Sequence, residues 1–195
     1  MSREEFEKAI HATEGPCIIV ASQEKGKEFL VARVAHLLGE GVAPEEILIL
    51  TSSALEAEVL KNDFKKTGGG ERILRRIRDF HALSEELVKR HANLLGVTED
   101  VRTLAPDKII LYAQRLLGTD PLLRNHYGKQ ARYIMASDFN VLNASELAII
   151  DLLGAAWRNI CVVGQSRPVH TLFETRVDCF QTFRAQYVNV SEIRL

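Results

Sequence analysis

The segment that decides the fold runs Glu14-Gly-Pro-Cys-Ile-Ile-Val-Ala-Ser-Gln-Glu-Lys-Gly-Lys-Glu28. Its run from Cys17 to Ala21 is short, apolar and preceded by a Gly-Pro break, which is typical of a strand buried in a parallel sheet. We expect a polar loop from Ser22 to Lys27 and then a helix from about Glu28 to Leu38, where apolar residues recur at helical spacing. Strand, loop and helix in this order form the first unit of an α/β fold.

The same alternation continues along the rest of the chain. A second buried strand is expected at 47–50, with a polar N-cap and a helix from about 54 to 64 after it. Further strands are expected at 73–77, 133–136, 160–163 and 187–195. Helices are expected at 4–12, 82–95, 106–117, 144–153 and over most of 169–183, and 118–129 is interpreted as a connecting loop. The pattern predicts an α/β fold with a parallel sheet, in a single domain spanning 1–195.

Composition limits the class of protein. The 195 residues are 46% apolar, which excludes a disordered chain, and the net charge is −1, so any contact with DNA requires a local basic patch. Cys17, Cys161 and Cys179 lack C-x-x-C spacing, and the first two lie in apolar runs, which favours buried thiols over a disulfide or a metal site. No apolar stretch is long enough to span a membrane, so we expect a cytoplasmic protein without a membrane partner.

Five segments, in a fixed order, resemble the motifs of one family. They are Glu14–Ala21, Pro44–Thr51, Phe80-His81, Tyr133–Asn143 (Tyr-Ile-Met-Ala-Ser-Asp-Phe-Asn-Val-Leu-Asn) and Asn159–Gly164 (Asn-Ile-Cys-Val-Val-Gly). In this order the chain resembles, over essentially its whole length, the first RecA-like (1A) domain of UvrD/Rep/PcrA-like superfamily 1 DNA helicases. The resemblance implies a three-layer P-loop NTPase (RecA-like) fold with a mainly parallel central sheet, which in intact members binds ATP, Mg²⁺ and DNA.

The resemblance implies that Gly26 and Lys27 occupy the Gly-Lys pair of the phosphate loop and that Glu28 replaces the magnesium-binding hydroxyl. These three residues are the candidate nucleotide-binding positions. Ser22 and Glu24 replace glycines that a loop wrapping phosphates needs. Two interpretations remain open: residual anion binding at Lys27, or a charged turn at a helix N-terminus, where Glu24 and Glu28 favour the helix dipole. The second is favoured.

The positions that resemble the magnesium and water-activating motifs also depart from the family. Ser137 and Asp138 stand where the Walker B acids are expected, which leaves Asp138 as the single candidate catalytic residue. Gln165 follows Gly164 where the family carries an acid, and Phe6 stands at the position of the adenine-reading glutamine. The histidines show no metal-ligand spacing, so no metal site is expected. ATP and Mg²⁺ are therefore expected as cofactors only if the altered loop still binds them.

For DNA, the resemblance implies contacts from the loops after the second and third strands. The candidates are Thr51, Ser52, Phe80 and His81. Four arginines between positions 72 and 78 form either an anion-binding edge or a solvated face. The flanking acids Glu71 and Asp79 favour the solvated face.

Two family features are missing, which shapes the functional hypothesis. Only 52 residues separate His81 from Ile134, so we expect a reduced helical insertion at about 82–130 in place of a full inserted subdomain, and we expect no second RecA-like domain. The leading hypothesis is a helicase domain homologue that does not hydrolyse ATP and binds DNA or a protein partner in DNA repair or recombination. The alternatives are an ATP-binding, DNA-dependent ATPase or helicase subunit that needs a second RecA-like domain, and an N-terminal fragment of such a protein.

Overall fold

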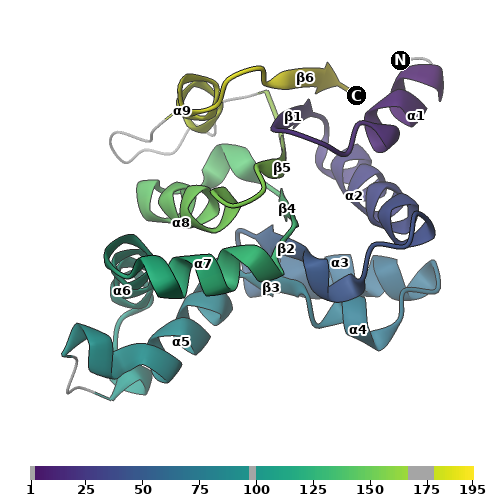
Figure 1. Ribbon diagram of the computed structural model, residues 1–195. Coiled ribbons are helices and arrows are strands. Elements are labelled where there is room, and N and C mark those ends of the chain that lie inside the picture. Colours follow the sequence, from purple (N-terminus) through teal and green to yellow (C-terminus); the bar gives the residue numbers. More distant parts are fainter. Residues whose placement is uncertain (1–2, 97–99, 167–177) are drawn as a thin grey trace.

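The computed structural model describes residues 3–96, 100–166 and 178–195. Within these residues six parallel strands form one sheet in the order β3-β2-β4-β5-β1-β6 (Figure 1). The strands are β1 (Cys17–Val20), β2 (Ile47–Thr51), β3 (Ile77–Asp79), β4 (Tyr133–Ala136), β5 (Asn159–Gly164) and β6 (Ser191–Arg194). The predicted α/β fold with a parallel sheet is confirmed.

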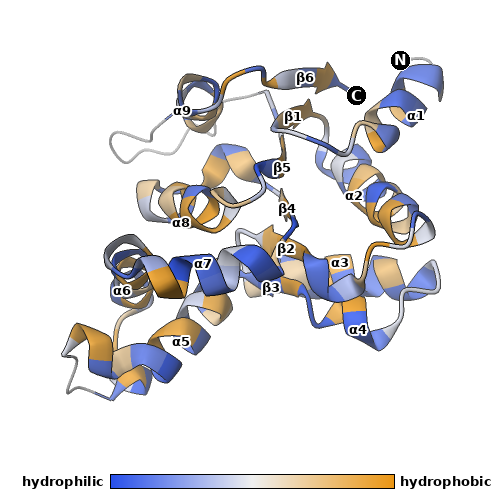
Figure 2. Ribbon diagram, viewed as in Figure 1, coloured by the Kyte–Doolittle hydropathy of each residue, from blue (hydrophilic) through white to orange (hydrophobic). Residues whose placement is uncertain are grey.

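Helices cover both faces of the sheet (Figure 1). One face carries α1 (Arg3–His11), α2 (Gln23–Gly39), α3 (Ala54–Lys66) and α4 (Glu71–Leu74). The other carries α5 (Phe80–His91), α6 (Pro106–Thr119), α7 (Pro121–Gln130), α8 (Ala144–Gly154) and α9 (Cys179–Gln186). Short 3₁₀ helices lie at Pro44–Glu46, Ala92–Leu95, Val101–Thr103 and Phe139–Val141. Figure 2 shows that the outward faces of α3 and α7 are largely hydrophilic, as expected for the outer layers of a three-layer fold.

The strands are apolar on both sides because each face of the sheet has its own core. Along β1, Ile18 packs into the core beneath α5, α6 and α8, whereas Ile19 packs into the core beneath α2 and α3. The register places Ile18 beside Val162 of β5, and both belong to the same core. Continuous apolar runs of four to six residues are the sequence pattern that a doubly covered parallel strand requires.

The predicted loop at 22–27 is wrong, because α2 begins at Gln23. Ser22 caps the helix, and its side chain accepts a hydrogen bond from the Lys25 N–H. Gln23, Glu24 and Lys25 are good helix formers, and no glycine before Gly26 interrupts them. Local propensity therefore extends the helix through the segment in which the resemblance places a phosphate loop.

Two other predicted elements are wrong, and one lies partly outside the described residues. The expected strand at 73–77 is divided between α4, which ends at Leu74, and β3, which begins at Ile77. The expected loop at 118–129 is mostly α7, which starts with Pro121 after the Asp120 cap. The expected helix over 169–183 is described only from Cys179 onward, since 167–177 lie outside the described residues.

The segment between β3 and β4, in which a reduced insertion is expected, forms α5, α6 and α7, and Figure 1 shows all three at one end of the molecule. Their apolar faces join the same core as α8. No described helix is both long and apolar enough to span a bilayer.

Candidate nucleotide site

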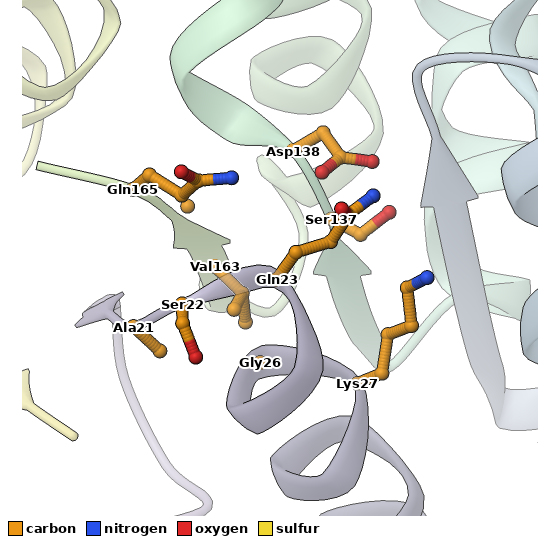
Figure 3. A pocket seen from close by; sticks show the side chains of 10 residues that line it. Ala21, Ser22, Gln23, Gly26, Lys27, Ser137, Asp138, Val163 and Gln165 are labelled. Atoms are coloured by element: carbon orange, nitrogen blue, oxygen red, sulfur yellow. The ribbon is translucent and has the colours of Figure 1, made fainter. Parts of the chain in front are cut away.

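The carboxyl ends of β1, β4 and β5 meet around a small cavity, the place where doubly wound sheets bind ligands (Figure 3). Its lining residues are Ala21, Ser22, Gln23, Gly26, Lys27, Ser137, Asp138, Val163, Gly164 and Gln165. The structure thus brings Gly26, Lys27 and Asp138 of the predicted site together. The cavity volume is about 20 Å³, which holds one water molecule. Pockets for cofactors and small ligands are ordinarily at least ten times larger.

The first turn of α2 forms where the resemblance places a phosphate loop. The Gly26 N–H donates to the Ser22 carbonyl at 2.8 Å, and the Lys25 N–H donates to the Ser22 Oγ at 3.4 Å. A phosphate loop needs successive backbone N–H groups that converge on the ligand. In this chain the N–H groups of Lys25 and Gly26 are instead bonded within the helix.

Gly26 has a packing role that does not depend on phosphate. A Cβ at this position would lie 2.8 Å from a Val163 methyl carbon of β5, closer than real Cβ atoms approach. The absence of a side chain lets the first turn of α2 lie directly against β5. Glu28, by contrast, is exposed on α2 and does not line the cavity.

The ammonium of Lys27 is held by Glu56 of α3. The Lys27 Nζ lies 3.2 Å from one Glu56 carboxylate oxygen, and the Gln23 Nε2 donates to the other at 2.9 Å. The side chains of Lys27 and Glu56 are only 21% and 20% exposed, so water screens the pair less than it would at the surface. Figure 3 shows Lys27 and Gln23 extending from α2 toward Ser137 and Asp138. A carboxylate therefore already neutralises the cation expected to contact phosphate.

Glu56 was absent from the candidate residues, although one sequence signal points to it. Ser53-Ala-Leu-Glu56 matches the capping-box pattern, and the Ser53 hydroxyl does accept from the Glu56 N–H at 3.3 Å. The pattern predicts that the Glu56 side chain turns back to its own helix. Its pairing across to α2 depends on the packing of α2 against α3, which the local sequence does not reveal.

Asp138 has an unusual backbone and a shifted pKa. Its φ of 50° and ψ of 35° lie in the left-handed region, which an aspartate adopts only uncommonly. Burial and then the charge of Glu56 raise the pKa of Asp138, while a hydrogen bond from the Ser52 hydroxyl (3.4 Å) and the charge of Lys27 act to lower it. The neighbouring Ser137 hydroxyl is buried and has no hydrogen-bond partner among the described residues.

Replacing Asp138 by Asn is expected to raise the free energy of unfolding at pH 7 by about 0.5–2 kcal/mol, which is the usual gain in stability from one stabilising substitution. Because the pKa of Asp138 is raised on folding, the native state retains its proton to a higher pH than the unfolded chain. Stability contributed by this group therefore falls as pH rises from the ordinary aspartate range through the raised pKa. Asparagine avoids that loss and tolerates positive φ. Urea unfolding at pH 4 and pH 7 tests this; a gain no larger at pH 7 than at pH 4 contradicts it.

The loops after β4 and β5 are joined by Asn140. Its side-chain oxygen accepts from the Gln165 N–H at 2.9 Å, and a Cβ on Gly164 would lie 2.7 Å from the same oxygen. Phe6, which the resemblance places at the adenine-reading position, packs edge-on against Phe29 of α2 at a centroid distance of 6.1 Å. Both residues make internal contacts.

The four candidate DNA-binding residues do not form one exposed surface. Thr51 is buried, and its hydroxyl donates to the Ser53 carbonyl at 2.9 Å. The Phe80 side chain is 1% exposed and belongs to the core, so its ring has no face free to stack on a base. Ser52 and His81 are partly exposed.

Three of the four arginines near β3 are engaged within the protein. Arg72 pairs with Glu45 through two hydrogen bonds of 2.7 Å. Arg76 donates to the Ile47 carbonyl at 2.8 Å, and Arg78 pairs with Glu86. This region therefore offers little unpaired positive charge.

Comparison with known proteins relates this geometry to a family. A model described as the UvrD/REP helicase N-terminal domain matches residues 2–109, more than half of the chain. The ATP-dependent DNA helicase PcrA of Staphylococcus aureus is 30% identical over 104 residues, and PcrA of Staphylococcus epidermidis is 31% identical over the same length. The aligned part covers 52% of this chain and 14% of each relative.

The fold has a counterpart among solved structures. The crystal structure of Pif1 helicase from Candida albicans matches 100% of this chain and 40% of its own chain, with a TM-score of 0.52 and 10% sequence identity. That likeness extends over the whole sheet, including the part beyond residue 109. With a sequence match over more than half its length, the chain belongs to the UvrD/REP helicase N-terminal domain family.

Proposed function

We propose that this chain is a helicase-type domain that does not hydrolyse ATP and acts as a binding module for nucleic acid or protein in DNA repair or recombination. The observation that carries the proposal is the closed phosphate site: the first turn of α2 occupies the loop position, and Glu56 neutralises Lys27.

The chemistry of the remaining positions supports the same proposal. Phosphoryl transfer needs a cation on the β- and γ-phosphates, a hydroxyl and an acid on Mg²⁺, and a group that positions the attacking water. Glu28 would place a negative charge where a neutral hydroxyl is needed. Ser137 would place a neutral hydroxyl where a negatively charged acid is needed. Asp138 remains, but its pKa is raised and its nearest acidic neighbour, Glu56, belongs to the lysine pair.

The competing function is an ATP-binding subunit completed by a second RecA-like domain. The observation in its favour is that Gly26, Lys27 and Asp138 surround one cavity at the correct end of the sheet. For ATP to enter, the first turn of α2 would have to unwind and Lys27 would have to leave Glu56.

Titration with a fluorescent ATP analogue and Mg²⁺ separates the two functions. The wild type, Lys27→Ala and Glu56→Gln are compared, with phosphate release measured in parallel with and without single-stranded DNA. Because the phosphates find no loop in this chain, we expect no saturable binding at high micromolar protein and no phosphate release in any of the three. Lys61→Ala on α3, which removes a lysine paired only with Glu58, is the matched control for loss of charge.

Saturable binding by the wild type that disappears in Lys27→Ala contradicts the proposal. Binding gained only by Glu56→Gln also contradicts it, because a phosphate loop that one carboxylate holds shut is latent and not lost.

For the ligand of the binding module, we propose that the loops after β2 and β3 contribute through Ser52 and His81, since Thr51 and Phe80 are buried. Asp138 accepts from the Ser52 hydroxyl, the charge of Glu56 acts on Asp138, and Lys27 is already paired. Nucleic acid would therefore gain little electrostatic attraction from these groups.

A further inference from the structure

Cys17 and Cys161 lie side by side on neighbouring strands. The register of β1 and β5 pairs the two residues directly (Figure 1). Both side chains belong to the core beneath α2 and α3, so they project from the same face of the sheet. They are 3% and 2% exposed, and both are free thiols. Two thiols from distant parts of the sequence therefore meet in a region that the proposed function does not use.

The spacing of this pair suits a disulfide. Adjacent strands of a sheet lie about 4.7–4.9 Å apart, and cysteines joined by a disulfide have Cα atoms about 4.4–6.8 Å apart. Directly paired residues meet this condition without a shift of the register. The Cys161 thiol also donates a hydrogen bond to the Cys17 sulfur, so the two sulfur atoms are already in contact. An S–S bond between them requires only side-chain rotation.

The two thiols differ in how readily they ionise. The hydrogen bond from Cys161 lowers the pKa of Cys17 against the effect of burial, and the charge of Arg33 lowers it further. The same hydrogen bond, together with burial, raises the pKa of Cys161. Arg33 is itself 2% exposed, so its guanidinium acts on the pair from within the core. Because the thiolate is the nucleophile, Cys17 is the thiol that reacts first.

Cys179 provides a comparison within the same chain. It is 3% exposed, but it belongs to the core on the other face of the sheet. Its thiol donates to the Leu142 carbonyl at 3.3 Å, and burial raises its pKa. Cys179 therefore has the burial of the pair but lies across the sheet from the other two cysteines of the chain.

We propose that Cys17 and Cys161 are a site of reversible oxidation, at which a peroxide converts the two thiols to a disulfide between β1 and β5. The Cys17 thiolate attacks one oxygen of hydrogen peroxide and breaks the O–O bond. This step gives a sulfenic acid at Cys17 and, with the proton that Cys17 released, one water molecule. The Cys161 thiol then attacks the sulfenic sulfur, and the displaced hydroxyl group leaves as a second water with the Cys161 proton. Two electrons pass from the thiols to the peroxide, and a dithiol reductant returns them.

The disulfide would join the two strands that lead into the nucleotide cavity. β1 ends at Val20, just before Ala21 and Ser22, and β5 ends at Gly164. A bond between positions far apart in the sequence stabilises a fold by restricting the unfolded chain. Because both thiols are buried, the reaction needs a local opening of the core and is expected to be slow. It needs neither ATP nor a partner, so it goes beyond the proposed function.

Peptide mapping of the oxidised chain tests the proposal. The intact chain is treated with hydrogen peroxide at neutral pH, the remaining thiols are alkylated after unfolding, and the peptides are identified by mass spectrometry. We expect Cys17 and Cys161 in one linked peptide, with two fewer hydrogen atoms than the separate peptides, and Cys179 alkylated. The melting temperature is expected to rise by about 5–10 °C and to return to its first value with dithiothreitol.

Three alanine variants test the role of each thiol. In Cys161→Ala the sulfenic acid at Cys17 has no thiol to resolve it, so we expect dimedone, which traps sulfenic acids, to label Cys17. In Cys17→Ala we expect Cys161 to react no faster than Cys179. Cys179→Ala is the matched control and is expected to form the disulfide at the rate of the wild type.

Several results would overturn the proposal: no linked peptide in the wild type, a disulfide that includes Cys179, equal oxidation of all three thiols, or a melting temperature that does not rise. Equal trapping of Cys17 and Cys161 in their respective variants would overturn the assigned order of reaction. The mapping uses the wild type, so it stands even where a variant fails to fold. The ATP-analogue titration is independent, since neither result changes the expected outcome of the other.

Discussion

Replacing Arg33 by Met is expected to lower the free energy of unfolding by about 3 kcal/mol. Arg33 lies on α2, is 2% exposed, and donates hydrogen bonds to the Ala9 carbonyl at 2.7 Å and the Ala12 carbonyl at 2.6 Å. These carbonyls lie at the C-terminal end of α1, so a single guanidinium holds that helix against α2. Methionine fills much of the space but leaves both acceptors unpaired, and each orphaned acceptor costs about 1–3 kcal/mol.

The matched control is Arg75→Met, since Arg75 is exposed at the end of α4. Surface changes of this kind are ordinarily within about 0.5 kcal/mol of neutral. Urea unfolding gives both values, and hydrogen exchange shows whether α1 loses protection before the rest of the chain. A loss below about 1 kcal/mol in Arg33→Met would mean that α1 is held mainly by its apolar contacts, such as that of Phe6 on Phe29.

The sheet could be predicted from the sequence because its strands are buried on both faces. Ile47–Thr51 and Tyr133–Ala136 are fully buried, and each stands in the sequence as an apolar run between polar segments. Such runs need no long-range information. The short β3 was misplaced because Ile77–Asp79 carries polar residues at two of its three positions, as an edge strand tolerates.

The start of α2 was predicted incorrectly for a different reason. The expected loop came from the polar run at 22–27, whereas Ser22-Gln-Glu-Lys25 has the capping residue and the helix formers that start a helix. Where a motif loses its glycines, the local preference of the replacing residues decides the backbone. The same holds for α7, where Asp120-Pro121 signals a helix start inside a segment that had been interpreted as a loop.

The candidate site could be predicted only as a set of positions. The resemblance places Gly26, Lys27 and Asp138 at the ends of neighbouring strands, and the structure brings them to one cavity. The resemblance gives neither the direction in which the Phe80 side chain points nor the partner of Lys27. That partner, Glu56, is 29 residues away along the chain and becomes a neighbour only when α2 and α3 pack together.

Gly26→Val is expected to destabilise the fold by about 2–3 kcal/mol, whether or not phosphate ever binds. The new Cβ would lie 2.8 Å from a Val163 methyl carbon, and the additional methyl groups increase the overlap between α2 and β5. Overpacking of a tight core typically costs about 1–3 kcal/mol, and a β-branched residue gains less than alanine from leaving glycine in a helix.

The double variant Gly26→Val with Val163→Ala decides why the glycine is present. If Gly26 serves packing, removing the opposing methyl groups restores much of the lost stability, so the two free-energy changes are strongly non-additive. Val163→Ala alone is expected to cost about 1–2 kcal/mol through the cavity that it leaves. Additive losses in urea unfolding would show that the valine meets an obstacle other than Val163. A rescued double variant would show that Gly26, which the resemblance places in the phosphate motif, is required by the contact between helix and sheet.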